Sequence, residues 1–118
     1  MKKKIIILGS TGSIGLTTLN IINKKKQFKI FLLSAKNNYR LISKQIIKYK
    51  PKYFVITNPL VYKKINQKFK NKKTKILNSY DKIFLNGKAD IAISAIPGIA
   101  GLFPTLSILR FTKKILLA

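Results

Sequence analysis

IIILGSTGSIGLTTL, residues 5–19, places an apolar run, a glycine-rich turn and an amphipathic stretch in immediate succession. That order predicts a strand, a tight turn and a helix. Gly9, Gly12 and Gly15 stand three residues apart, and glycines let the backbone leave a strand sharply and approach a ligand closely. A helix that begins in such a turn directs unpaired N–H groups and its positive dipole end at a phosphate. We interpret the stretch as a dinucleotide-binding turn; the alternative is a turn that only joins a strand to a packed helix.

Beyond this turn, strand-like apolar runs alternate with helix-like amphipathic stretches. Strands are expected at residues 4–8, 28–34, 53–57, 75–77, 90–95 and 114–117, and helices at 13–23, 38–49, 59–69, 79–87 and 102–109. Strict alternation implies right-handed βαβ units. The sequence therefore predicts an α/β fold, a Rossmann-like doubly wound domain with a mainly parallel sheet. We expect residues 1–118 to form one domain, and the apolar ending at Ala118 suggests the N-terminal fragment of a longer enzyme.

The composition excludes several kinds of chemistry. Cysteine and histidine are absent, and Asp81 and Asp90 are the only acidic residues. A disulfide framework, a Cys/His zinc site, a Ser-His-Asp triad and a cysteine nucleophile are therefore excluded. No pattern brings the two carboxylates together as an acid–base pair. We predict no catalytic residue and no metal ligand in this chain, which is expected to bind more than it catalyses.

The net charge of +23 raises a second interpretation, binding to a polyanion. Against it, Arg40 and Arg110 are the only arginines among 25 basic residues, whereas a dedicated nucleic-acid binder uses more arginine. The abundance of Lys, Ile, Asn, Phe and Tyr fits AT-rich codons, so we favour a drifted, lysine-rich surface. Weak non-specific nucleic-acid binding is expected under either interpretation.

No targeting or membrane segment is predicted. The first strand begins almost at once, which leaves no room for a signal peptide. Apolar runs such as residues 30–33 are far shorter than the roughly 20 residues of a membrane helix. A cytoplasmic protein is the expectation.

The end of the second predicted strand indicates which dinucleotide would bind. An NAD site usually has an acid there, which holds the ribose 2′-hydroxyl. Here Lys36, Asn37, Asn38 and Arg40 follow the strand, with no acid nearby. Positive side chains would attract a 2′-phosphate that a carboxylate would repel. The sequence predicts NADP(H) rather than NAD(H).

Several segments together resemble the N-terminal domain of the 1-deoxy-D-xylulose 5-phosphate reductoisomerase family. They are residues 7–15 with Thr18 and Leu19, residues 33–38 with Leu41 and Gln45, Pro51 and Lys52, residues 95–106, and residues 113–118. The resemblance implies an NADPH-dependent enzyme of non-mevalonate isoprenoid synthesis that rearranges and reduces a sugar phosphate. It also implies a divalent metal, Mg or Mn, and a homodimer in the full-length enzyme.

The resemblance also assigns cofactor contacts. It implies that Thr11, Gly12, Ser13 and Ile14 contact the NADPH phosphates and that Lys36, Asn37 and Asn38 stand at the 2′-phosphate end. Lys36 occupies a position where the family commonly has glycine, and Asn37 one where it has lysine. In the family, the segment matching Leu117 and Ala118 leads into an Asn-Lys-Glu segment, and the metal-binding acids and the substrate site lie beyond it. This chain alone is therefore predicted to be inactive.

Other classes of protein fit the sequence less well or remain open as alternatives. A short-chain dehydrogenase needs a Tyr-x-x-x-Lys pair, and no tyrosine here has lysine four positions on. A semialdehyde dehydrogenase needs a cysteine. A lysine-rich RNA-binding protein on a Rossmann scaffold and a non-functional remnant remain as alternatives.

Overall fold

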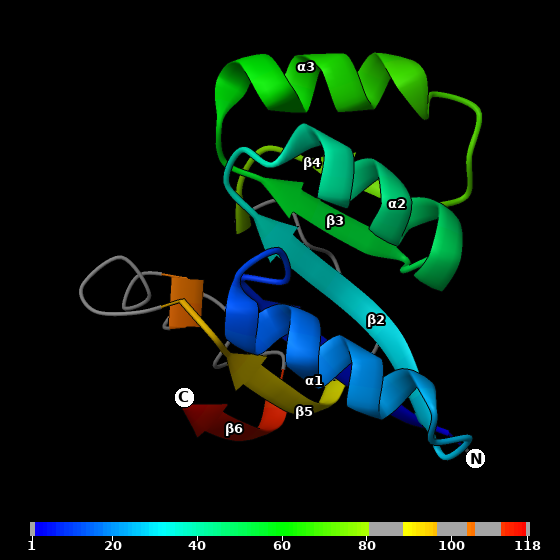
Figure 1. Cartoon of the computed structure of the whole chain (residues 1–118), viewed down its shortest axis with the longest axis vertical. Helices are drawn as coiled ribbons and strands as arrows, with labels where there is room; N and C mark the ends of the chain where they lie inside the picture. The colour runs from blue at the N-terminus through cyan, green and yellow to red at the C-terminus, as the bar shows by residue number, and fades with distance from the viewer. Residues whose placement is uncertain (1, 81–88, 97–103, 106–111, 118) are drawn as a thin grey trace.

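The computed structural model describes residues 2–80, 89–96, 104–105 and 112–117 (Figure 1). The strands are β1 (Lys3–Leu8), β2 (Phe28–Ala35), β3 (Tyr53–Ile56), β4 (Lys75–Leu77), β5 (Ala89–Ser94) and β6 (Thr112–Leu117), and the helices are α1 (Ser13–Asn23), α2 (Tyr39–Tyr49) and α3 (Pro59–Lys68). Strand and helix alternate from β1 to β4, as the sequence predicts. None of the helices in these ranges is long and apolar enough to cross a membrane.

In the described part of the chain the strands form one six-stranded sheet with the order β4-β3-β2-β1-β5-β6. Every pair of neighbouring strands is parallel, and the arrows of β2, β3, β5 and β6 point to the same side in Figure 1. From β1 the chain moves outward through β2, β3 and β4, then returns to the other side of β1 for β5 and β6. The strand order thus reverses between β1 and β5. This confirms the predicted doubly wound α/β fold.

Helices α1, α2 and α3 cover one face of this sheet (Figure 1). The three crossovers that contain them run in one direction across the sheet, and right-handed connections then put their helices on the same side. Ile5 and Ile7 of β1 pack toward these helices, whereas Ile6 and Leu8 belong to the core on the opposite face. All four are essentially inaccessible to solvent. Burying such a side chain stabilises the fold by roughly 1.5–3 kcal/mol relative to leaving it exposed. Strand β1 therefore contributes to the core on both faces of the sheet.

Most predicted boundaries agree with the structure to within one or two residues. The last strand is longer than predicted, because it begins at Thr112 and pairs with β5 through Ala89↔Thr112 and Ile91↔Lys114. Two consecutive lysines argue against a buried strand, but β6 lies at the edge of the sheet, where lysines are tolerated and discourage pairing with another chain. The predicted helices 79–87 and 102–109 lie mostly outside the described residues; Pro104 and Thr105 are helical.

Candidate functional site

A cavity lies at the carboxyl ends of the strands where the sheet order reverses. Open α/β sheets bind their ligands at this place, because the loops after the two neighbouring strands diverge there and leave a crevice. The cavity has a volume of about 290 Å³. Its lining includes Gly9, Thr11, Gly12, Lys36, Thr57 and Tyr80.

Gly9 is required by the backbone and by packing. Its φ is +79°, in the left-handed region where residues with a side chain are strained. A Cβ at this position would also lie 2.8 Å from Cγ1 of Ile96 and 3.2 Å from the carbonyl carbon of Ala95. Gly9 therefore lets the loop after β1 approach the end of β5, which closes one side of the cavity.

Gly15 and Gly12 differ in what a side chain would meet. A Cβ on Gly15 would collide with the carbonyl oxygen of Gly9 and lie 2.8 Å from Cα of Ser10. Gly15 is therefore required so that α1 can pack on the turn. A Cβ on Gly12 would meet nothing closer than the Gly9 oxygen at 3.8 Å, and its φ of −78° suits any residue. The missing side chain of Gly12 therefore leaves space that a ligand can use.

The N-terminus of α1 differs from those of the other two described helices. Asn38 caps α2, where its Oδ1 accepts a hydrogen bond from the Leu41 N–H at 3.1 Å. Asn58 caps α3 in the same way, accepting from the N–H groups of Leu60 and Val61. Gly12 occupies the cap position of α1 and provides no side-chain acceptor. The first N–H groups of α1 are therefore available to an anion, where the helix dipole favours negative charge.

Buried hydrogen bonds fix the turn to its neighbours. The Ser10 hydroxyl donates to Oε1 of Gln45 at 2.7 Å, and Nε2 of Gln45 donates to the Ser10 carbonyl at 2.9 Å. The Ser34 carbonyl accepts from the backbone N–H groups of Gly9 and Ser10 at 3.0 and 2.8 Å. Ser10, Ser34 and Gln45 are buried. The turn is thus tied to both β2 and α2, which holds its backbone ready for a ligand without reorganisation.

Tyr80 is a cavity residue that the sequence analysis did not identify. Its ring is buried and its hydroxyl forms a hydrogen bond with Ser34. Burial raises the pKa of Tyr80 above its ordinary value, and the bond to Ser34 opposes that rise in part. The hydroxyl therefore stays neutral around pH 7. Tyr80 follows β4 at the far edge of the sheet, so no local sequence pattern places it beside β1. It comes near β1 because the chain returns along the sheet between β4 and β5.

The structure brings some of the predicted cofactor residues together. Thr11, Gly12 and Lys36 line the cavity. The other predicted residues, Ser13 and Ile14 at the start of α1 and Asn37 and Asn38 before α2, are exposed beside it and do not line it. The Asn38 oxygen is engaged in the cap of α2, so only its amide NH₂ is free to bind a ligand.

Charge near the cavity is positive. Lys36 is exposed at the end of β2, and Arg40 is exposed in the first turn of α2. Asp90, the acidic residue in the described ranges, lies at the opposite end of the sheet, where its Oδ2 accepts from the Lys4 N–H at 2.8 Å. Within those ranges no cluster of three potential metal ligands exists. The site therefore suits an anion held by backbone N–H groups and a lysine.

The strand order, the glycine turn and the uncapped helix together define a dinucleotide-binding α/β domain. The family model of 1-deoxy-D-xylulose 5-phosphate reductoisomerase matches residues 5–118. The chain therefore belongs to this family.

Curated relatives carry that family name. The chain is 43% identical over 98% of its length to the reductoisomerase of Pelagibacter ubique, and 38% identical over 98% to that of Buchnera aphidicola. It spans 31% of the length of each of these relatives.

Solved structures agree. The reductoisomerase of Zymomonas mobilis in complex with NADPH superimposes on the whole chain with a TM-score of 0.86 at 28% identity, over 32% of its own length. A DOX-P reductoisomerase in complex with NADPH, fosmidomycin and magnesium gives 0.86 at 30% identity, covering 98% of this chain and 30% of its own. The family predicted from the sequence is confirmed.

Proposed function

We propose that this chain is the NADPH-binding part of a 1-deoxy-D-xylulose 5-phosphate reductoisomerase. Such an enzyme rearranges and reduces 1-deoxy-D-xylulose 5-phosphate to 2-C-methyl-D-erythritol 4-phosphate in non-mevalonate isoprenoid biosynthesis. The observation that carries the proposal is the uncapped N-terminus of α1 beside Gly12, in a chain that superimposes on a reductoisomerase bound to NADPH.

In this proposal the protein orients the dinucleotide by its phosphates. The N–H groups of Ser13 and Ile14 and the hydroxyl of Thr11 donate to the pyrophosphate, as the free first turn of a helix allows. Lys36, with Asn37 and Asn38 beside it, attracts the 2′-phosphate, and no acid in the described ranges opposes it. Bound NADPH supplies the hydride for the reduction. Ser10, Gln45 and Ser34 hold the turn that receives it.

The remaining functions of the enzyme require residues that these 118 do not offer. The chain has no histidine, cysteine or glutamate, so we propose that Mg²⁺ or Mn²⁺ and the sugar phosphate bind to parts that the family's longer members possess. We expect no turnover from these residues alone, and a homodimer for the complete enzyme. The single domain over residues 1–118 and the cytoplasmic location stay predictions.

Calorimetric titration of the chain with NADPH and with NADH tests the proposal. We expect NADPH to bind and NADH to bind more weakly, because only NADPH carries the phosphate that Lys36 would attract. Thermal melting with and without NADPH provides a second measurement: ligand at 100 times its Kd stabilises the folded state by about 2.7 kcal/mol. A folded chain that is indifferent to NADPH would overturn the proposal and favour the RNA-binding alternative. A chain that does not fold would favour the remnant.

A further inference from the structure

The parallel topology gathers the lysines at one end of the molecule. In a βαβ domain, strands begin and helices end at the same end of the sheet, opposite the nucleotide-binding crevice. Exposed lysines concentrate at this end: Lys2, Lys3 and Lys4, Lys24, Lys25 and Lys26, Lys29, Lys48, Lys50 and Lys52, Lys68, Lys70, Lys72, Lys73 and Lys75, and Lys113 and Lys114. We call these residues the lysine end. Along the sequence the same residues look dispersed.

This charge has almost no internal compensation. Asp90 lies at the lysine end, and its carboxylate pairs with Lys113 at 3.4 Å, an exposed contact. It is the one acidic residue in the ranges that the structure describes. Lys48 and Lys68 lie in the last turns of α2 and α3, where a cation offsets the negative dipole end. That role does not extend to Lys29 and Lys75, which lie in β2 and β4.

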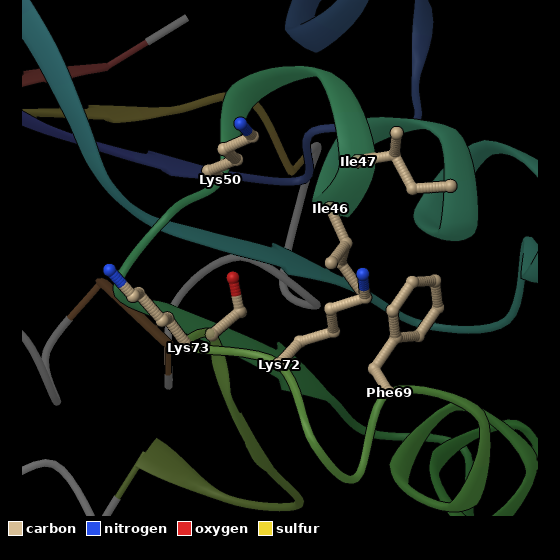
Figure 2. Close-up of a pocket in the computed structure, with 7 residues that line it drawn as sticks. Ile46, Ile47, Lys50, Phe69, Lys72 and Lys73 are labelled. Atoms are coloured by element: carbon tan, nitrogen blue, oxygen red, sulfur yellow. The ribbon is translucent and has the colours of Figure 1, made fainter.

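Two cavities at the lysine end flank the C-terminus of α2. One, of about 280 Å³, is lined by Lys25, Lys26, Lys29 and Lys48 together with the half-buried rings of Phe28 and Tyr49. The other, of about 380 Å³, is lined by Lys50, Lys72 and Lys73. Figure 2 shows two further lining residues, Ile46 on α2 and Phe69 at the start of the segment that leads to β4.

We propose that the lysine end binds single-stranded nucleic acid. Its lysines contact the backbone phosphates, and unstacked bases lie against the rings of Phe28 and Tyr49. Basic grooves that carry aromatic rings bind single strands in this way with little sequence preference. A membrane surface fits less well, because interfacial binding needs a broad apolar face, and Ile47 is the exposed large apolar residue in the lining of these two cavities. The proposal does not depend on NADPH binding, which we assign to the opposite end.

Fluorescence anisotropy of a labelled 12-nucleotide oligo(dT), titrated with the 118-residue chain at several salt concentrations, tests this proposal. The variant K25Q/K26Q/K29Q removes three charges beside the rings. Its matched control, K44Q/K63Q/K64Q, removes three exposed charges from the middle of α2 and α3. Both variants lower the net charge equally, so they separate a site from bulk attraction.

We expect the first variant to bind at least tenfold more weakly in moderate salt and the control to change less than twofold. The slope of log K against log salt should fall by about 2 in the first variant, since each lost phosphate contact on a single strand accounts for about 0.7. Tyr49→Leu removes the ring and keeps an apolar side chain against the core, and we expect it to weaken binding about tenfold. Circular dichroism checks that each variant is folded.

Three results would overturn the proposal. Equal weakening in both triple variants would mean that net charge alone drives binding. Tighter binding to a 12-base-pair duplex than to the single strand would exclude the contact with unstacked bases. Binding to phosphatidylserine vesicles that is more sensitive to K25Q/K26Q/K29Q than oligo(dT) binding would assign the surface to a membrane.

Discussion

Replacing Gly12 with aspartate separates what the glycine does for the fold from what it does for a ligand. Gly12 occupies the cap position of α1 with φ −78° and ψ 174°, an ordinary conformation for a capping aspartate. The new Cβ has space, since the nearest heavy atom would be 3.8 Å away. The carboxylate would accept from the first N–H groups of α1 and place negative charge at the positive dipole end.

The change should therefore stabilise the free protein. Aspartate exceeds glycine at a cap position by a few tenths of a kcal/mol, and a negative charge in the first turn adds about 0.3–1 kcal/mol. A total near 1 kcal/mol raises the Tm of a chain of this size by about 4 °C. Differential scanning calorimetry measures this directly.

The same change should weaken NADPH binding strongly. Its carboxylate would occupy the N–H groups that we assign to the pyrophosphate and would repel the phosphates. The loss of one or two charge-assisted hydrogen bonds, about 3 kcal/mol, corresponds to an affinity more than 100-fold weaker. Leu60→Asp is the matched control, because Leu60 is 73% exposed in the first turn of α3: it adds the same charge at a helix start and should leave NADPH affinity within twofold. Unchanged NADPH binding by Gly12→Asp would refute our assignment of the α1 N-terminus.

Further predictions concern the support of the turn, the cofactor preference and acid stability. Gly15→Ala should destabilise the chain by about 3 kcal/mol in urea titrations, because its methyl group meets backbone atoms of Gly9 and Ser10; a wild-type midpoint would contradict the packing. Gln45→Leu should cost about 1–3 kcal/mol and also weaken NADPH binding, since the Ser10 carbonyl loses the Gln45 donor and the buried Ser10 hydroxyl keeps only its longer bond to the Ser34 carbonyl. Lys36→Glu should weaken NADPH at least tenfold and NADH little; equal losses would exclude a 2′-phosphate contact. The pKa of Asp90 is lowered, chiefly by the hydrogen bond from the Lys4 N–H and further by Lys113. The contribution of Asp90 to the free energy of unfolding is therefore complete above about pH 3.8 and is lost as the pH falls through its lower folded-state pKa. When the free energy of unfolding is measured against pH, Asp90→Asn should lack this loss of stability in acid.

Local patterns predicted the part of the site that is local in sequence. The turn from Gly9 to Gly15 was found because the strand, the glycines and the helix adjoin one another. The sequence also predicted a helix at residues 59–69, and in the structure α3 begins at Pro59, with Asn58 as its cap. Both features depend on contacts within a few residues, which spacing and residue type can indicate.

Features that depend on the order of the strands were not predictable in this way. Tyr80 reaches the cavity because the chain crosses back along the sheet after β4, and Gly9 is a glycine partly because Ile96, at the end of β5, lies against it. Lys113 and Lys114 were expected to precede or begin a strand, yet they lie inside β6, because an edge strand leaves their side chains in solvent. In each case the deciding contact joins residues far apart in sequence.

The position of the lysines in the molecule likewise depends on the fold and cannot be seen along the sequence. The AT-rich codon usage that we favour would account for how many lysines the chain has, but not for where the fold puts them. Dipole compensation explains those in the last turns of α2 and α3, whereas Lys29, Lys52 and Lys75 stand at or just before the starts of strands, where no dipole favours them. Lys29 lines one of the two cavities, and Lys52 and Lys75 follow closely in sequence after Lys50 and Thr74, which line the other. Comparing K25Q/K26Q/K29Q with K44Q/K63Q/K64Q tests whether the lysines that line one cavity together with Phe28 and Tyr49 have a function.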